Sequence, residues 1–144
     1  MAYVIPDSFK TDLLKGTFNF DSSGGSTFKL ALYTDISGLT TSTTAFTATN
    51  EVSTSGTNYS SGGNALTNSG VSISSNIAFV DFADLTFSSV TLSAVGALIY
   101  KSGGSNEAVL VLDFGGTKTA TNGDFVVQFP TASSSAAIIR LGNA

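Results

Sequence analysis

Large apolar side chains recur at every second position in several stretches of the chain, which is the pattern of β-strands with one buried face. Within residues 27–34, Phe28, Leu30 and Leu32 share one parity. Further strands are predicted at residues 71–79, 90–100, 107–114, 125–129 and 136–141, and residues 82–87 are predicted to form a short strand or a turn. About seven or eight strands separated by turns predict an all-β fold, either an antiparallel β-sandwich or a small barrel, with jelly-roll or immunoglobulin-like topology.

Two of these predicted strands are apolar on both faces. They cover the second half of residues 90–100 and residues 107–114, and the Gly- and Ser-rich residues 101–106 join them. A strand that is apolar on both faces lies in the interior of a sheet, so we expect these two to form its central hairpin.

Two local patterns make narrower predictions. Residues 71–79 carry four large apolar side chains of one parity, which predicts a single strand with one apolar face: Val71, Ile73, Ile77 and Phe79. The dipeptide Asn122–Gly123 accepts positive φ angles at little cost, so it predicts a chain reversal before the strand at 125–129.

One short helix is predicted near the N-terminus. Asp7 or Ser8 can cap its start, and Gly16 stands where a glycine ends a helix. Phe9 and Leu13 are four residues apart and share one face. A helix of about nine residues is marginal alone, so this face must dock, either on its own domain or as an arm on a neighbouring subunit.

The segment after the first long strand is polar and poorly patterned. It spans about residues 35–69, with Tyr59 and Leu66 as its expected anchors. Loops longer than about 15 residues are uncommon unless they are functional, and they lie over the surface or against a partner. We therefore divide the chain into an N-terminal arm with a short helix, residues 1–26, and one β-domain, residues 27–144, which carries this insertion.

The composition excludes several kinds of active site. The chain has 144 residues with no His and no Cys. Ser–His–Asp and Cys–His nucleophiles, zinc sites built on His or thiolate, and iron–sulfur clusters therefore cannot form. The six basic residues are scattered and the net charge is −4, so no basic stripe exists to follow a nucleic-acid backbone. We expect no enzymatic activity, no cofactor and no nucleic-acid partner.

Charged residues are only 11% of the chain, which suits a surface that other proteins cover. No stretch approaches the roughly 18 apolar residues of a membrane span. The N-terminus lacks the basic region and apolar stretch of a signal peptide. We therefore expect a soluble chain made in the cytosol, with no membrane partner.

Carboxylates are the remaining candidates for chemistry. Asp81 and Asp84 lie three residues apart, and a hydrolase would need two such groups across a cleft. A turn in which Asp84 bonds its own backbone explains the pair better. Calcium takes oxygen ligands, so a calcium site is not excluded. Glu51, Asp113 and Asp124 are further candidate ligands, although no EF-hand spacing occurs.

Four segments, in this order, resemble a known group of proteins. They are Ser8–Lys10 with Leu13–Gly16; Thr27–Thr34; Thr49–Val52 with Asn58–Gly63; and Val111–Gly115 followed by Asn122–Gly123 and Ile138–Leu141. Together they resemble small virion structural proteins of tailed bacteriophages, and the resemblance covers nearly the whole chain. The resemblance implies no catalytic residues for this chain.

The resemblance implies a capsid decoration or cement protein on the outer head surface, made in the host cytoplasm. Its partners would be the major capsid protein and its own copies, as a homo-oligomer such as a trimer. The alternative is a tail-associated or fibre-base protein that touches host glycan through loop residues such as Tyr59. A carboxylate hydrolase and a small-ligand carrier are weaker alternatives. The predicted contact residues are Tyr3, Val4, Ile5, Phe9, Leu13, Asn58, Tyr59 and Leu66.

Overall fold

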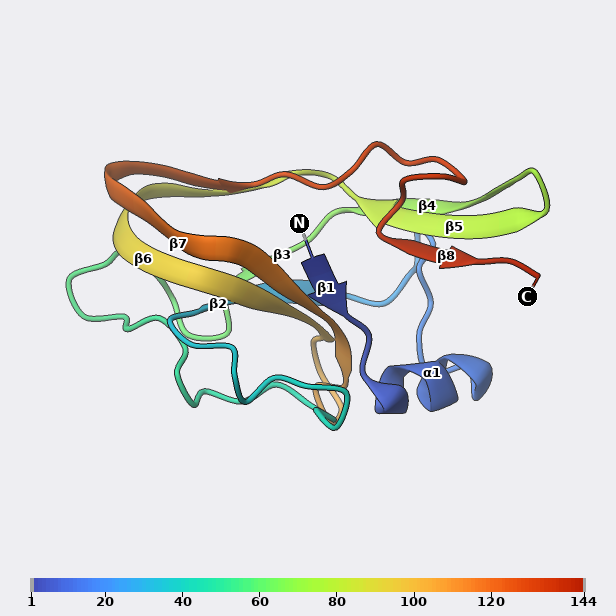
Figure 1. The fold of residues 1–144 in the computed structure, drawn as a ribbon, viewed down its shortest axis with the longest axis horizontal. Coiled ribbons are helices and arrows are strands. Elements are labelled where there is room, and N and C mark those ends of the chain that lie inside the picture. Colours follow the sequence, from blue (N-terminus) through green and yellow to red (C-terminus); the bar gives the residue numbers. More distant parts are fainter. Residues whose placement is uncertain (1, 144) are drawn as a thin grey trace.

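The computed structural model describes residues 2–143. In chain order its elements are β1 (Ala2–Val4), α1 (Asp7–Leu14), β2 (Phe28–Tyr33), β3 (Asn64–Ala65), β4 (Asn68–Ser74), β5 (Ile77–Phe82), β6 (Leu85–Lys101), β7 (Ala108–Val127) and β8 (Ile139–Leu141). They form two antiparallel sheets, of order β1-β7-β6-β2-β3 and β4-β5-β8, beside the short helix (Figure 1). The all-β prediction is confirmed.

The hairpin of β6 and β7 is the frame of the larger sheet. The two strands pair from Leu85↔Val127 to Tyr100↔Ala108, but residues 114–117 of β7 leave the ladder. Gly115 and Gly116 have φ angles of 77° and 148° there, which glycine adopts readily, and residues 114–117 form a large bulge opposite Val95. The hairpin consequently bends and folds back over itself (Figure 1). We call residues 96–101 and 108–113 its proximal limb, and residues 85–94 and 118–127 its distal limb.

The continuity of this hairpin corrects two sequence predictions. Residues 82–87 were expected as a short strand or turn, separate from the strand at 90–100, but β6 begins at Leu85 and runs unbroken to Lys101. Asn122–Gly123 was expected to reverse the chain, but β7 continues through it. Asn122 does adopt a positive φ of 45°, and it uses this conformation in a bulge within the ladder rather than in a hairpin turn.

The prediction of one strand at residues 71–79 is also wrong. The chain reverses at Ser75 and Asn76, whose φ angles of 52° and 63° are both positive, as a two-residue hairpin turn requires. The predicted single apolar face is thereby divided. Val71 and Ile73 project to one face of the smaller sheet, and Ile77 and Phe79 of β5 project to the other face.

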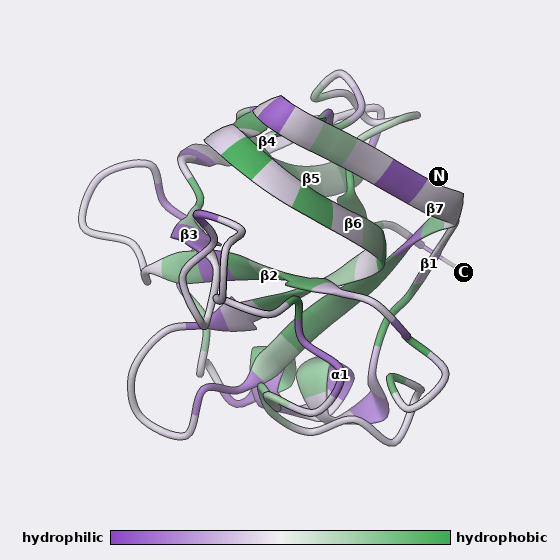
Figure 2. Ribbon diagram, turned by 90° about the vertical axis from the view of Figure 1, so that its left-hand side faces the viewer, coloured by the Kyte–Doolittle hydropathy of each residue, from purple (hydrophilic) through white to green (hydrophobic). Residues whose placement is uncertain are grey.

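The main core lies between the two limbs of the hairpin. Figure 2 shows apolar residues along β2 and the proximal limb, and an alternation of apolar and polar residues along the distal limb. The inward side chains of both limbs and of β2 belong to one buried cluster, including Leu30, Leu32, Val90, Leu92, Ile99, Leu112, Phe125 and Val127.

The N-terminal helix docks on its own domain. Phe9 is 2% exposed, and its ring centroid lies 4.9 Å from that of Phe18. Gly16 follows the helix at a φ of 80°, as predicted. The predicted N-terminal cap is wrong: the N-cap is Pro6, whose side chain has no acceptor, and no side chain caps the helix. The backbone N–H of Asp7 donates to the Thr41 carbonyl at 2.9 Å.

The first part of the insertion covers the outer face of the proximal limb. Leu39 is buried with Tyr33, Leu98 and Val111 in a second cluster. Phe46 stacks on Tyr100 with ring centroids 4.8 Å apart. This cover is why β6 and β7 are apolar on both faces here, as their sequences predicted.

Candidate functional site

The predicted contact residues do not form one surface. Tyr3 and Val4 on β1 are 41% and 36% exposed, whereas Phe9, Tyr59 and Leu66 are at most 8% exposed. Asn58 is exposed, but its amide donates to the Ser88 and Ser89 carbonyls at 3.3 and 3.2 Å. Ile5 and Leu13 are partly buried against the core.

Tyr59 serves as an internal anchor of the insertion. Its hydroxyl accepts a hydrogen bond from the Leu32 backbone N–H at 2.9 Å and donates one to Glu51 at 2.8 Å. Burial, with the Glu51 carboxylate beside it, raises the pKa of Tyr59 well above its ordinary value. Tyr59 could present itself to a glycan only if this network opened.

Glu51 is the centre of the same network. Its carboxylate also accepts hydrogen bonds from the Ser61 hydroxyl at 3.0 Å and the Gly62 N–H at 2.6 Å. The Tyr100 hydroxyl donates to the Gly62 carbonyl at 2.7 Å. These bonds attach the second part of the insertion to the larger sheet, and they occupy the oxygens that made Glu51 a calcium candidate.

The other carboxylates are separate backbone acceptors. Asp84 accepts the N–H of Phe129 at 2.8 Å, so the prediction that it bonds its own turn is wrong. Asp113 accepts the N–H of Gly115 at 2.8 Å, and Asp124 accepts that of Ser89 at 3.2 Å. Within residues 2–143, no three carboxylates come together to hold a metal ion.

Asp81 is the one charged residue that is buried, at 3% exposure, among those described. Its Oδ1 accepts the N–H of Phe82 at 2.9 Å, while Oδ2 has no hydrogen-bond partner there. Burial raises the pKa of Asp81 above its ordinary value of 3.8, and the charge of Asp84 adds to this. A group that prefers to stay protonated in the fold costs stability once it ionises.

Asp81→Asn is expected to remove a pH dependence of stability. The folded protein holds the proton of Asp81 more tightly than the unfolded chain does. Protonated Asp81 therefore stabilises the wild-type fold fully below pH 3.8, and this contribution is lost as the pH rises through the folded-state pKa. The free energy of unfolding of the variant, relative to wild type, should rise over this window and then level off. Urea unfolding at a series of pH values measures it; a difference that stays constant with pH would contradict the assignment.

An apolar groove lies between the N-terminal segment and the smaller sheet. It encloses about 290 Å³. One wall is formed by residues 13–20, and the other by the smaller sheet. The lining residues are Leu13, Phe18, Asn19, Phe20, Val71, Ala78, Phe79, Val80, Ile139 and Leu141. No lining residue is charged, so the groove suits apolar side chains rather than ions.

Large apolar side chains at the edge of this groove are exposed to solvent. Val71 pairs with Val80, which is buried, and Ile73 with Ala78, so all four share the face that continues from the core. Yet Val71 and Ile73 are 54% and 75% exposed, and Leu141 of β8 is 62% exposed. The β4–β5 hairpin extends past the core above α1, which leaves this part of its apolar face uncovered (Figure 1).

Sequence reasoning found these residues but not the surface that they form. Leu13 was the one predicted contact residue that lines the groove. Val71 and Ile73 were predicted to share one apolar face with Ile77 and Phe79. The dipeptide Ser75–Asn76 could have indicated that the chain reverses after Ile73, because Asn adopts positive φ angles more often than most other residues.

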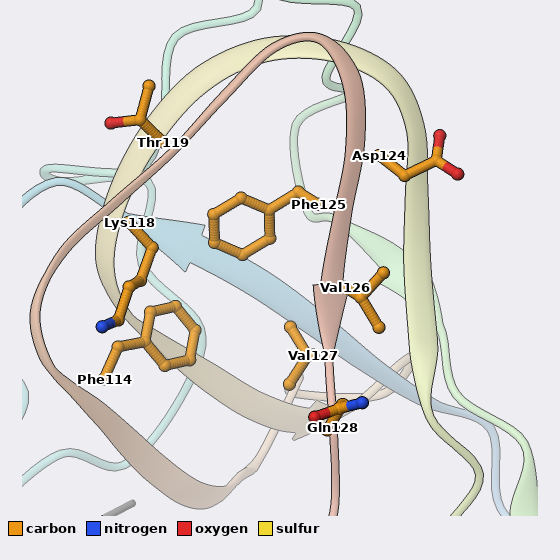
Figure 3. A pocket seen from close by; sticks show the side chains of 8 residues that line it. All are labelled: Phe114, Lys118, Thr119, Asp124, Phe125, Val126, Val127 and Gln128. Atoms are coloured by element: carbon orange, nitrogen blue, oxygen red, sulfur yellow. The ribbon is translucent and has the colours of Figure 1, made fainter.

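A second hollow, of about 390 Å³, lies in the bend of β7 (Figure 3). All its lining residues belong to β7 or follow it directly: Phe114, Lys118, Thr119, Asp124, Phe125, Val126, Val127 and Gln128. We call it the hairpin hollow. Two charged residues, Lys118 and Asp124, are among its lining, whereas no charged residue lines the groove.

Comparison with protein-family models, with curated proteins and with solved structures gives no match. No helix in the described part of the chain is long and apolar enough to cross a bilayer.

Proposed function

We propose that the chain is a non-enzymatic structural protein of a tailed-phage virion, most simply a decoration protein that binds the outer surface of the head. The observation that carries the binding part of this proposal is the uncovered apolar face of Val71, Ile73 and Leu141 beside the groove. The phage assignment comes from the sequence resemblance described above.

The exposed face fits contact with a protein surface. The centres of protein interfaces are depleted in charge and rich in apolar side chains, and exposed apolar patches rimmed by polar residues mark such sites. Complete burial of a Val, Leu or Ile side chain contributes about 1.5–3 kcal/mol, so covering these three from their present exposure contributes roughly 3–6 kcal/mol. The occupant we propose is an apolar ridge of the major capsid protein.

Such a contact would reinforce a shell mechanically. A protein that bridges two capsomers adds contact free energy across their boundary, which must be overcome before the shell ruptures. Each contact can be weak, because several copies of the site in one oligomer bind with a much higher effective concentration. Chemistry is not required of such a protein, which agrees with the scattered carboxylates.

Ile73→Asp is expected to abolish binding to heads. The carboxylate would have to lose its water in an apolar contact, which is costly. The measurement is co-sedimentation of the purified protein with heads of the phage that encodes it, after stripping. Ser72→Asp is the matched control, because Ser72 is exposed and projects to the opposite face of β4. Equal sedimentation of the two variants, with both folded by circular dichroism, would contradict the proposal.

The location on the virion is a separate question with its own experiment. Icosahedrally averaged cryo-electron microscopy of the virion should show a small β-domain at regular positions on the head. Immunogold labelling of the tail instead would favour the tail-associated alternative. That alternative can no longer rely on Tyr59 as a surface residue, because Tyr59 is 3% exposed.

A further inference from the structure

The strand β4 forms one edge of the smaller sheet, because β5 lies between it and β8 (Figure 1). Among the strands that the structure describes, the other edge strands are short: β1 and β8 have three residues each and β3 has two. β4 has seven residues, and none is charged or a proline. Natural proteins protect their edge strands with charges, prolines or short length, because unpaired backbone groups there can pair with another chain. β4 has a bulge between Asn68 and Val71, but residues 71–74 beyond it are regular and exposed.

The backbone N–H and C=O groups of Val71 and Ile73 point away from β5. Both residues of the turn after β4 have positive φ angles, so the pair that flanks this two-residue turn, Ser74↔Ile77, exchanges hydrogen bonds. Hydrogen-bonded and non-hydrogen-bonded pairs alternate along an antiparallel ladder. The pairs that Val71 and Ile73 make with β5 are therefore of the second kind. Each of these two residues thus presents one donor and one acceptor along the open edge.

The sequence around Ser72 is complementary to itself in antiparallel register. If Ser72 lies opposite Ser72 of a second copy, Val71 lies opposite Ile73 of that copy, and Ile73 opposite its Val71. The residues whose backbone groups point outward then meet one another, and each of these two pairs exchanges two hydrogen bonds. Apolar side chains meet on one face and the serines on the other. A two-fold pairing also brings like charges together, so the absence of charge on β4 favours its own copy as the partner.

We propose that two copies of this chain pair edge to edge through β4, in the antiparallel register centred on Ser72. The two smaller sheets then form one continuous sheet of order β8-β5-β4 followed by β4-β5-β8 of the second copy. Paired residues project to the same face, so the uncovered apolar faces of both copies lie side by side. The contact uses the edge of β4, and it does not depend on the phage assignment. It extends the proposed function by doubling the apolar surface offered to a capsid.

The length of the open edge sets the strength of this contact. Ser22 lies beside Gly70, with its Oγ 3.6 Å from the position that a Cβ would take there, so the open edge begins at Val71. Three paired residues on each strand are as many as join β1 to β7 or β5 to β8. A contact of this size is far below the roughly 1,600 Å² of a stable interface, so we expect a dissociation constant in the micromolar to millimolar range. Copies held side by side on a shell would pair at a much higher effective concentration.

The first test is disulfide trapping in the full chain, which has no cysteine of its own. In the proposed register the two Ser72 residues form a non-hydrogen-bonded pair with Cα atoms about 4.5 Å apart, within the range that a disulfide spans. Oxidised glutathione should therefore convert Ser72→Cys to a covalent dimer on non-reducing gels. Ser74→Cys is the matched control, because Ser74 is exposed on the same face but lies opposite Gly70 of the second copy. Its dimer should form about tenfold more slowly or less.

The second test is sedimentation equilibrium of the full chain from about 10 μM to about 1 mM, the range that brackets such an affinity. The mass should rise from that of one chain toward that of two. Ser72→Asp sets two carboxylates opposite each other, so it should raise the dissociation constant about tenfold or more. This variant leaves the apolar face of each copy intact, since Ser72 projects to the other face. Both tests use the chain alone, so their result is separate from that of binding to heads.

Three outcomes would overturn the proposal. The first is a mass of one chain throughout the concentration series, and the second is a mass that passes two chains and approaches three or more. The third is equal trapping of Ser72→Cys and Ser74→Cys, which would mean random collision rather than the register centred on Ser72. Each variant is compared with the wild type by circular dichroism, and an unchanged spectrum is expected because both serines are exposed.

Discussion

Phe9→Ala is expected to lower the free energy of unfolding by about 3–5 kcal/mol, the cost of removing a buried aromatic side chain. Phe9 is 2% exposed, and its ring meets Phe18 and Phe20 at centroid distances of 4.9 and 6.2 Å. The loss is a large part of the 5–15 kcal/mol by which domains are stable. Urea unfolding followed by far-ultraviolet circular dichroism measures it.

The matched control lies on the same helix. Leu14 is 86% exposed, and alanine is a good helix former, so Leu14→Ala should change stability by less than about 0.5 kcal/mol. If Phe9→Ala behaved like this control, the N-terminal segment would be an arm that is independent of the core. The expected difference means that the segment cannot be deleted without damage to the β-domain.

Gly63→Ala is expected to destabilise the protein by about 4 kcal/mol or more, or to prevent folding altogether. Gly63 has a φ of +75°, and a methyl group there would overlap the carbonyl oxygen of Leu30 and lie 2.6 Å from its carbonyl carbon. Those are backbone atoms of β2, which is fully buried at Leu30, so neither partner can yield. Thermal unfolding and the yield of soluble protein measure the effect.

Gly16→Ala separates the two causes of this loss. Gly16 has a similar φ of +80°, but nothing lies within 4 Å of an added methyl group. Only the left-handed backbone conformation is then penalised, at about 1–2 kcal/mol. If both variants lost the same stability, the close approach of the insertion to β2 would not be a real constraint.

The alternation of side chains was sufficient to predict an all-β chain, a short helix ending before Gly16 and a central hairpin. The sequence prediction failed where the same pair of residues is compatible with two different backbone conformations. Asn122–Gly123 supports a bulge as readily as a turn, and Ser75–Asn76 makes a turn without the glycine that usually signals one. Both errors concern positive φ angles at one or two residues, which local sequence specifies weakly.

The candidate sites were less predictable than the fold, because burial depends on contacts distant in sequence. Tyr59 has the neighbours of a binding loop, yet its hydroxyl reaches Leu32 and Glu51. Lys118 looked like one of several scattered cations, and only its pairing with Ala94 places it in the hairpin hollow. The apolar groove depends in the same way on the reversal at Ser75, which decides the face that Val71 occupies.

The pairing of β1 with β7 has a consequence for the order of folding during synthesis. Ala2 pairs with Asp113, so β1 cannot find its partner strand until synthesis has passed Asp113. Until then Phe9 lacks part of the final core around it. We therefore expect the β6–β7 hairpin, whose two strands are neighbours in the sequence, to form before β1 pairs with it.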